Sequence, residues 1–281
     1  MPKISALMPI YNTPKEYLTK TIESILSQTF TDFELIILND SPNNKELEKI
    51  VKSYKDKRIK YLSNEKNIGI TPSRNKLINL AKGEYIAIID HDDISIPTRF
   101  YEEATYLDNN PDVGVVSGQI QYFQNNHGKS KHKIEDADIK INLLNSIAVS
   151  HPCAMIRKSI LTENNIQYDE KFTPAEDYKL WIDLIPYTKF HNIDKVLLLY
   201  RDHKENTAKV QNYKINMATA KLRSILKEKY SYLYEYKLLT IGGGITLKLL
   251  GFLPILSIKK YSKKVKVYLF NKILILTIKY K

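Results

Sequence analysis

The chain has 281 residues, 43% of them hydrophobic, which is enough for a folded core and excludes an intrinsically disordered protein. Its single cysteine, Cys153, excludes an intrachain disulfide, and its first residues do not form a signal peptide, so we expect a cytoplasmic protein. The net charge of +12 arises at the C-terminal end: residues 1–219 contain 29 Lys and Arg against 29 Asp and Glu, and residues 220–281 contain 14 against 2. This excludes a protein that wraps nucleic acid over its whole surface and indicates a tail that binds an anionic partner.

Apolar segments of strand length alternate with segments of helical periodicity along the first 90 residues. Strands are predicted at residues 4–9, 34–38, 59–62 and 85–89. Helices are predicted between them, at residues 14–29, 47–54 and 71–82. Thr13, Pro14 and Glu16 are typical of the start of the first helix, and Gly83 of the end of the third. The alternation predicts an α/β fold in which a doubly wound, mostly parallel sheet has helices on both faces.

The second half of the chain is less regular. A fifth strand is predicted at residues 113–117, and the polar residues 124–133 indicate a mobile loop. Two clusters follow, one at residues 173–177 before a helical run at 178–185, and one at residues 200–203 after the strand-like residues 196–199. Both clusters contain acidic or histidine side chains, so both are candidates for functional residues.

Polar side chains follow the predicted strands at their carboxyl ends. They are Asn12, Asp40, Asn67, Asp90, Asp92 and Asp93. Because doubly wound sheets bind ligands at this edge, we expect one crevice to collect them.

The acidic cluster at residues 90–93 is the most informative of these sites. In an extended chain Asp90 and Asp92 point the same way and Asp93 points to the other side, so two carboxylates can share one ion. Mg²⁺ and Mn²⁺ bind oxygen ligands, commonly one or two carboxylates together with the phosphates of a substrate. The alternative interpretation is an acidic turn that only caps the following helix.

Taken together, these motifs resemble the inverting glycosyltransferases of family 2, whose nucleotide-sugar-binding domain has the GT-A fold. The resemblance covers residues 1–205. It consists of residues 8–12, 27–30, 39–41, 67–69, 74–75 and 83–85, the DXD motif Asp90-His91-Asp92 with Asp93, the pair Glu176-Asp177, and His203. It implies a domain at residues 1–205, with a nucleotide-binding half at 1–118 and an acceptor half at 119–205, and a basic C-terminal region at 206–281.

The resemblance also implies roles for individual residues. Asp92, Asp90 and His203 would bind a divalent metal, Mn²⁺ or Mg²⁺, and Asp177 would be the general base, with Glu176 as the alternative. The donor would contact Pro9, Tyr11, Asn12, Asp40, Asn67, Arg74, Asp90 and His91. The competing interpretations are core packing for Tyr11, a solvated helix face for Arg74, a surface histidine for His203 and a helix start for the acidic pair. Asn39 and His91 depart from the pattern of many relatives.

The implied reaction moves a sugar from a nucleotide-diphospho-sugar, UDP-linked, to a hydroxyl group of a growing cell-surface glycan or glycolipid, such as lipopolysaccharide or capsule. Two alternatives stay open. A nucleotidyltransferase would also use paired carboxylates, but residues 11–14 do not form a glycine-rich phosphate loop. A catalytically silent, membrane-associated scaffold would not need metal, base and nucleotide residues together.

The C-terminal region is predicted to be largely helical. Residues 238–258 contain one charge but several glycines and a proline, so a membrane span is not favoured. Residues 259–276 place one set of apolar side chains on a helical face: Tyr261, Val265, Tyr268, Leu269, Ile273 and Leu276. This pattern predicts a basic amphipathic helix on an anionic membrane, at the inner face of the cell membrane. RNA binding by the lysines is the alternative, although no nucleic acid partner is expected.

Overall fold

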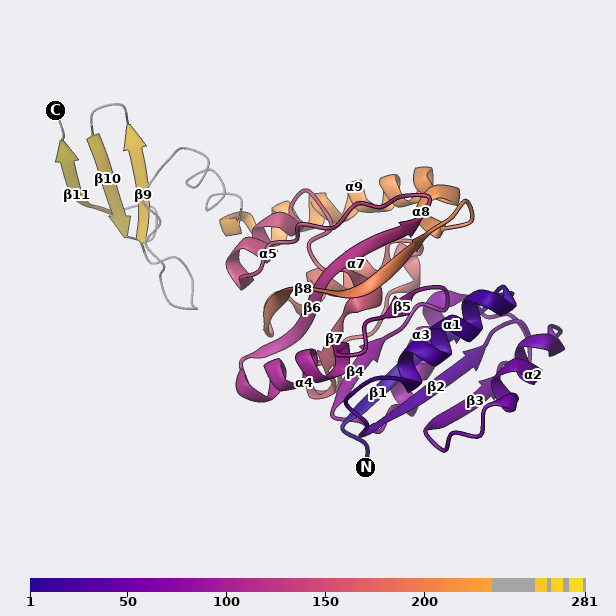
Figure 1. The fold of residues 1–281 in the computed structure, drawn as a ribbon. Helices are drawn as coiled ribbons and strands as arrows, with labels where there is room; N and C mark the ends of the chain where they lie inside the picture. The colour runs from indigo at the N-terminus through magenta and orange to yellow at the C-terminus, as the bar shows by residue number, and fades with distance from the viewer. Residues whose placement is uncertain (234–255, 262–263, 270–272, 280–281) are drawn as a thin grey trace. The chain divides into compact units, whose positions relative to one another are not determined.

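The computed structural model describes residues 1–233 and the backbone of residues 256–261, 264–269 and 273–279 (Figure 1). Contacts divide the chain into two compact units, Met1–Leu222 and Arg223–Lys281, which are described separately.

The first unit is built on one eight-stranded sheet with the order β3-β2-β1-β4-β7-β6-β8-β5. Its strands are β1 (Ile4–Ile10), β2 (Phe33–Asn39), β3 (Ile59–Ser63), β4 (Tyr85–Ile88), β5 (Ile94–Ser95), β6 (Val113–Gln124), β7 (Met155–Arg157) and β8 (Lys189–Asp202). The first four strands are parallel, as are β6 and β8, whereas β7 and β5 run antiparallel to their neighbours. The predicted α/β class with a mostly parallel sheet is confirmed.

Helices connect the strands and pack on the sheet, α3 on β1, α4 on β6 and α5 on β8. They are α1 (Lys15–Leu26), α2 (Lys45–Ser53), α3 (Ile70–Leu80), α4 (Arg99–Asn109), α5 (Asp136–Leu143), α6 (Lys158–Glu163), α7 (Glu176–Leu184), α8 (Thr207–Val210) and α9 (Asn212–Lys229). The predicted cap of α1 is wrong, because Pro14 is the N-cap residue and no side chain caps this helix.

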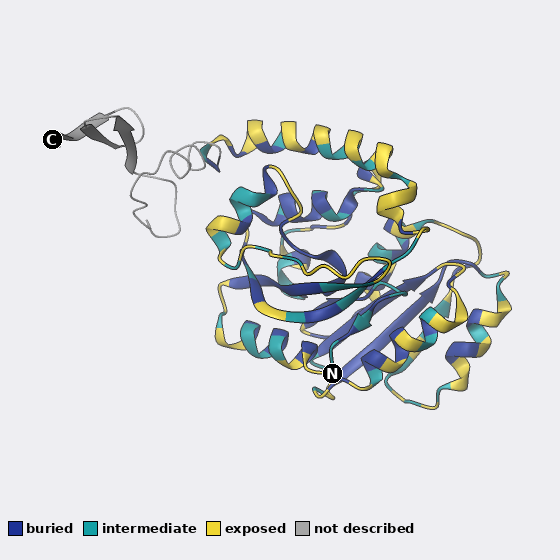
Figure 2. Cartoon of the chain, turned by 45° about the horizontal axis from the view of Figure 1, so that its top comes forward, coloured by how far each residue is buried: buried dark blue, intermediate teal, exposed yellow. Residues whose placement is uncertain are grey.

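The central strands are buried along their whole length. Every residue of β1 and β2 is buried, as expected for strands of a sheet that is covered on both sides. Leu18, Ile22 and Ile25 of α1, spaced at helical intervals, are fully buried in the same core. Figure 2 shows these buried strands beneath helices whose outer faces are exposed. The buried strands and helices therefore fix the positions of the polar residues at the strand ends.

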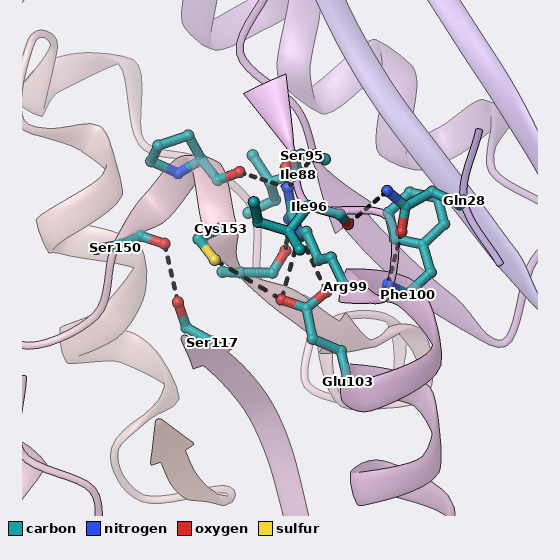
Figure 3. Close-up of polar contacts among 12 residues, drawn as sticks. Gln28, Ile88, Ser95, Ile96, Arg99, Phe100, Glu103, Ser117, Ser150 and Cys153 are labelled. Atoms are coloured by element: carbon teal, nitrogen blue, oxygen red, sulfur yellow. Dashed lines mark hydrogen bonds and ion pairs between the residues drawn. The ribbon is translucent and has the colours of Figure 1, made fainter. Parts of the chain in front are cut away.

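Arg99, at the start of α4, joins several chain segments in the interior (Figure 3). It forms an ion pair with Glu103 at 3.2 Å, and both side chains are completely buried. Its Nη1 donates to Ser95 Oγ at 3.1 Å and to the Pro152 carbonyl at 2.9 Å, and its Nη2 donates to the Ile88 carbonyl at 3.0 Å. Arg99 thus holds the chain both before and after the acidic residues 90–93.

Gln28, just after α1, holds the same region from the other side. Its Nε2 donates to the Ile96 carbonyl at 2.8 Å, and its Oε1 accepts from the Phe100 amide at 2.9 Å. The neighbouring Thr29 amide donates to the Pro97 carbonyl at 2.9 Å. Gln28 and Thr29, which belong to the family motif at residues 27–30, therefore support the chain after the acidic segment.

The sequence did not predict β5, just after the acidic segment, nor β7, α5 and α6 in the irregular half. Each is too short to produce a recognisable periodicity. The segment at 124–133, predicted as a loop, folds back on β6, where the Ser130 amide donates to the Ile120 carbonyl at 2.9 Å.

The second unit contains a three-stranded antiparallel sheet of β9 (Leu256–Tyr261), β10 (Lys264–Leu269) and β11 (Ile273–Lys279). The amphipathic helix predicted here is therefore wrong. Lysines alternate with valines at residues 264–267, which is the period of a strand, and β-branched residues favour strands. The apolar segment at 238–258 lies outside the described residues except for its last three. No described helix is long and apolar enough to cross a membrane.

Candidate active site

The acidic segment lies directly after β4. Asp93 is buried, whereas Asp90 and Asp92 are partly exposed. This division agrees with the predicted opposite orientation of Asp93. Burial raises the pKa of Asp93 well above its usual range, and the nearby charges of Asp92 and Asp90 raise it further.

Asp92 and His203 meet although 111 residues separate them in the chain. Their Oδ2 and Nε2 atoms are 2.9 Å apart, and both side chains are about 15% exposed. The Glu205 amide donates to His203 Nδ1 at 3.3 Å, so Nε2 carries the proton and donates to Asp92. Neighbouring ligands of an octahedral Mg²⁺ ion lie about 3 Å apart at bond lengths of about 2.1 Å. The spacing of the pair therefore fits an ion between these two atoms, with the proton of His203 moved to Nδ1 and the hydrogen bond from the Glu205 amide opened.

The three predicted metal ligands do not all converge. Asp90 directs its Oδ1 atom to Arg74, and within residues 1–233 no three His, Cys, Asp or Glu side chains gather as a metal cluster. Two protein ligands are a normal number for an ion that also binds the phosphates of a substrate.

Arg201 joins the chain around His203 to the acidic segment through hydrogen bonds. Its backbone amide donates to Asp93 Oδ1 at 2.8 Å, and its Nε donates to the Asp92 carbonyl at 2.7 Å. Its guanidinium lies between the rings of Tyr17 and Phe123, with distances of 4.0 and 4.6 Å to the ring centroids. Arg201 is 4% exposed, so it acts as a buried positioning residue.

Asn206 completes this loop. Its Nδ2 donates to the Arg201 carbonyl at 3.1 Å, and its Oδ1 accepts from the His203 amide at 2.6 Å. The sequence indicates a cluster at residues 200–203, and the family resemblance implies a function only for His203. Arg201 and Asn206 bind backbone atoms, and their only signal in the sequence is their position beside the histidine.

Arg74, at α3, connects the acidic segment with the acidic pair at α7. It donates to Glu176 Oε1 at 2.6 Å and to Asp90 Oδ1 at 3.2 Å. Burial lowers the pKa of Arg74, but Asp90 and Glu176 more than offset this and raise it. Arg74 thus lies within the carboxylate cluster and not on a solvated helix face.

Asp177 is the partly exposed member of the acidic pair, and Glu176 is buried. Loss of solvation raises the pKa of Asp177 to about 6, and the charge of Glu176 contributes, while Arg74 and a hydrogen bond from the Tyr178 amide oppose the shift. A carboxylate with a pKa near neutrality suits a general base.

Asp40 binds the loop after β3. Its Oδ1 accepts from the Ile68 amide at 2.9 Å and from Asn64 Nδ2 at 2.7 Å, and its Oδ2 accepts from the Gly69 amide at 2.8 Å. Gly69 has a positive φ of 92°, which favours glycine. Asn67 is exposed on this loop. Asp40 therefore shapes the loop, and both of its oxygens are engaged within the protein.

The other predicted donor residues differ in exposure. Tyr11 is 51% exposed, which excludes a core role, whereas Pro9 is buried in β1. Asn12 has a φ of 46°, and its amide donates to Ser41 Oγ at 3.1 Å. His91 is partly exposed, and its buried Nδ1 has no hydrogen-bond partner among the described residues.

The strand order and the carboxylates at the ends of parallel strands define a GT-A-type fold. The family model for glycosyl transferase family 2 matches residues 5–164, and the chain belongs to this family. It is a glycosyltransferase.

Two relatives illustrate the match. The chain is 40% identical over 207 residues to an uncharacterised glycosyltransferase of Methanocaldococcus jannaschii, with 71% of each chain covered. It is 31% identical over 234 residues to the O-antigen biosynthesis glycosyltransferase WbnJ of Escherichia coli, with 80% of this chain and 90% of WbnJ covered.

Solved structures agree on the fold. The chain is similar to S. aureus TarS 1–349 in complex with UDP, with a TM-score of 0.61 and 24% identity over 77% of this chain and 65% of TarS 1–349. It is also similar to the mannosyltransferase PcManGT of Pyrobaculum calidifontis in complex with GDP-Man and Mn²⁺, with a TM-score of 0.57 and 14% identity over 86% of this chain and 79% of PcManGT.

Proposed function

We propose that this glycosyltransferase is metal-dependent and inverting, and that it moves a sugar from a uridine-linked nucleotide-diphospho-sugar to a hydroxyl group of a growing cell-surface glycan. The observation that carries the proposal is the pair formed by Asp92 and His203 at the carboxyl edge of the sheet. TarS complexes with UDP and UDP-GlcNAc and the PcManGT complex with GDP-Man and Mn²⁺ support this choice of donor and metal.

The donor lies, in this proposal, across the edge formed by β1, β2 and β4. Asp92 and His203 would hold the divalent ion, whereas Asp90 is bound by Arg74. The ion supplies positive charge that offsets the charge developing on the leaving diphosphate. The base and ribose lie against the loops of β1 and β3, where Tyr11 is exposed for stacking and Asp40 fixes the loop of Asn67.

Asp177 accepts the proton of the acceptor hydroxyl as its oxygen attacks the anomeric carbon. The bond between that carbon and the diphosphate oxygen breaks at the same time, so the configuration inverts. Arg74 holds Asp90 and Glu176 in a fixed arrangement beside this reaction centre.

The acceptor is a glycan or glycolipid at the inner face of the cell membrane. The similarity to WbnJ, whose name assigns it to O-antigen biosynthesis, supports a cell-surface glycan. The cationic C-terminal region, which begins near residue 206, supports binding to an anionic membrane.

Calorimetric titration with UDP and UDP-sugars tests the donor site. We expect wild-type protein to bind UDP in the presence of Mn²⁺ and to lose this binding when a chelator is added. The reason is that the ion would join the negative carboxylate of Asp92 to the negative diphosphate of UDP. Asp92→Asn should reduce the Mn²⁺-dependent affinity, whereas Asp112→Asn, which removes an exposed acid paired with Lys189, should not. Equal binding with and without metal would remove the ion from the proposal.

The role of Arg201 gives a separate prediction. Arg201→Met should weaken Mn²⁺ binding about tenfold, because the loop of His203 is no longer held against Asp92; loss of an orienting partner typically costs 10–100-fold in metal affinity. Turnover should recover at high Mn²⁺ concentration. Electron paramagnetic resonance of free Mn²⁺ measures the affinity directly, and unchanged affinity would contradict the positioning role.

A further inference from the structure

We infer that the outer face of α8 and α9 is a docking surface for an anionic lipid bilayer. The inference rests on the proposed function, because an enzyme whose acceptor lies in a membrane gains from holding its donor site at the membrane surface. It assigns membrane binding to a described helix in the first part of the basic C-terminal region.

Three large apolar side chains stand exposed on this helical segment. Val210, Tyr213 and Met217 are 68%, 77% and 59% exposed. They are spaced three and four residues apart, and hydrogen bonds from the Gln211 amide to Thr207 and from the Ile215 amide to Gln211 continue the helical course from α8 into α9. Residues at this spacing lie on one helical face.

Two lysines belong to the same face. Lys214 lies four residues after Val210, and Lys221 lies four residues after Met217; both are exposed. Lys221 also lies 5.2 Å from the ring centroid of Phe172. Across residues 206–233 the sequence contains six Lys and Arg and one acid, Glu228. An apolar stripe with lysines is complementary to a bilayer of anionic lipids, where tyrosine occupies the interface and lysine reaches the headgroups.

The inward face of α9 is separate from this stripe. Leu222 is completely buried, so this part of the helix already has its core contact. In Figure 2 the exposed residues of this helix are drawn in yellow. Exposed apolar side chains grouped on one helical face, and not needed for the core, indicate an interaction surface.

The docking surface is connected to the metal-binding pair by a short loop. α8 begins four residues after His203, and Lys209 of α8 pairs with Asp202 of β8 at 2.5 Å. Asn206 binds both the Arg201 carbonyl and the His203 amide. A bilayer held by α8 and α9 would therefore lie near the site that binds the donor, where a lipid-linked acceptor is needed.

Sedimentation with phosphatidylglycerol–phosphatidylcholine vesicles tests the surface in the full chain. Wild type should bind these vesicles and not pure phosphatidylcholine. The double variant Tyr213→Ser/Met217→Ser and the double variant Lys214→Gln/Lys221→Gln should each lower the affinity about tenfold or more. Tyr187→Ser, at another exposed tyrosine, and Lys49→Gln/Lys55→Gln, at exposed lysines of another region, serve as controls and should bind like wild type.

A site-specific probe gives a second readout. Cys153 is completely buried, so Met217→Cys can be labelled selectively with an environment-sensitive fluorophore. Its emission should shift to shorter wavelength with anionic vesicles and not with RNA or neutral vesicles. Wild-type affinity in both double variants, an absent shift, or a shift with RNA alone would overturn the inference.

Donor binding separates this inference from the proposed function. The α9 variants should keep the UDP and Mn²⁺ affinity of the wild type. If the wild type binds vesicles but does not bind UDP, the proposed function is overturned and the docking surface is not.

Discussion

Asp177→Asn should lower turnover by about a hundredfold or more while leaving the affinity for UDP unchanged, because an amide cannot accept the proton of the acceptor hydroxyl. The matched control is Asp183→Asn on the same helix, whose carboxylate pairs with Lys179. Turnover of the two variants is compared at saturating donor and acceptor. Wild-type turnover in Asp177→Asn would remove the general base from this position.

The pH dependence of turnover tests the same residue independently. The base must be deprotonated to act, and the pKa of Asp177 is raised to about 6, mainly by desolvation. Activity should therefore rise as the pH increases through about 6 and level off above it. A rise near the ordinary pKa of about 4 for an exposed carboxylate would contradict this environment for Asp177.

Arg99→Met should destabilise the protein by about 3–5 kcal/mol, the usual cost of removing one partner from a buried ion pair. Glu103 would be left buried without its cation, and three backbone or hydroxyl acceptors would lose a donor. Urea denaturation measures the effect.

Two controls test whether the loss of stability in Arg99→Met comes from the unpaired charge of Glu103. Lys195→Met removes an exposed partner of Glu102 on the same helix and should cost less than about 1 kcal/mol. The double variant Arg99→Met/Glu103→Leu should recover part of the loss, because it leaves no unpaired charge. A small effect of Arg99→Met alone would show that the buried network is not essential for stability.

The first four strands were predictable because their apolar segments are long and separated by helical patterns. Strands β5 and β7 were not, because two or three residues carry no periodicity and owe their conformation to the partners β8, β4 and β6. The C-terminal strands were missed for another reason: apolar residues at 261–276 fall at helical spacing, and only residues 264–267 alternate as a strand does.

The candidate active site was likewise predictable from the sequence only in part. The family motifs assigned Asp92 and His203 to one site, and their side chains are in contact in the structure. They did not reveal that Arg74 binds Asp90 and Glu176, nor that Asp40 binds the loop at Ile68 and Gly69, because one sequence records no contacts. The roles of these residues toward the donor stay predictions.

The strand order also decides when the site can form during synthesis. Strands β1 to β4 can associate as soon as they have left the ribosome, but β5 pairs with β8, and the Asp93 carboxylate accepts a hydrogen bond from the Arg201 amide. Asp92 and Asp93 therefore acquire their contacts with His203 and Arg201 only after about 110 further residues have been synthesised. An unfinished chain holds the sheet without the assembled metal pair, so nascent or truncated copies should leave the cell's nucleotide-sugar pool untouched.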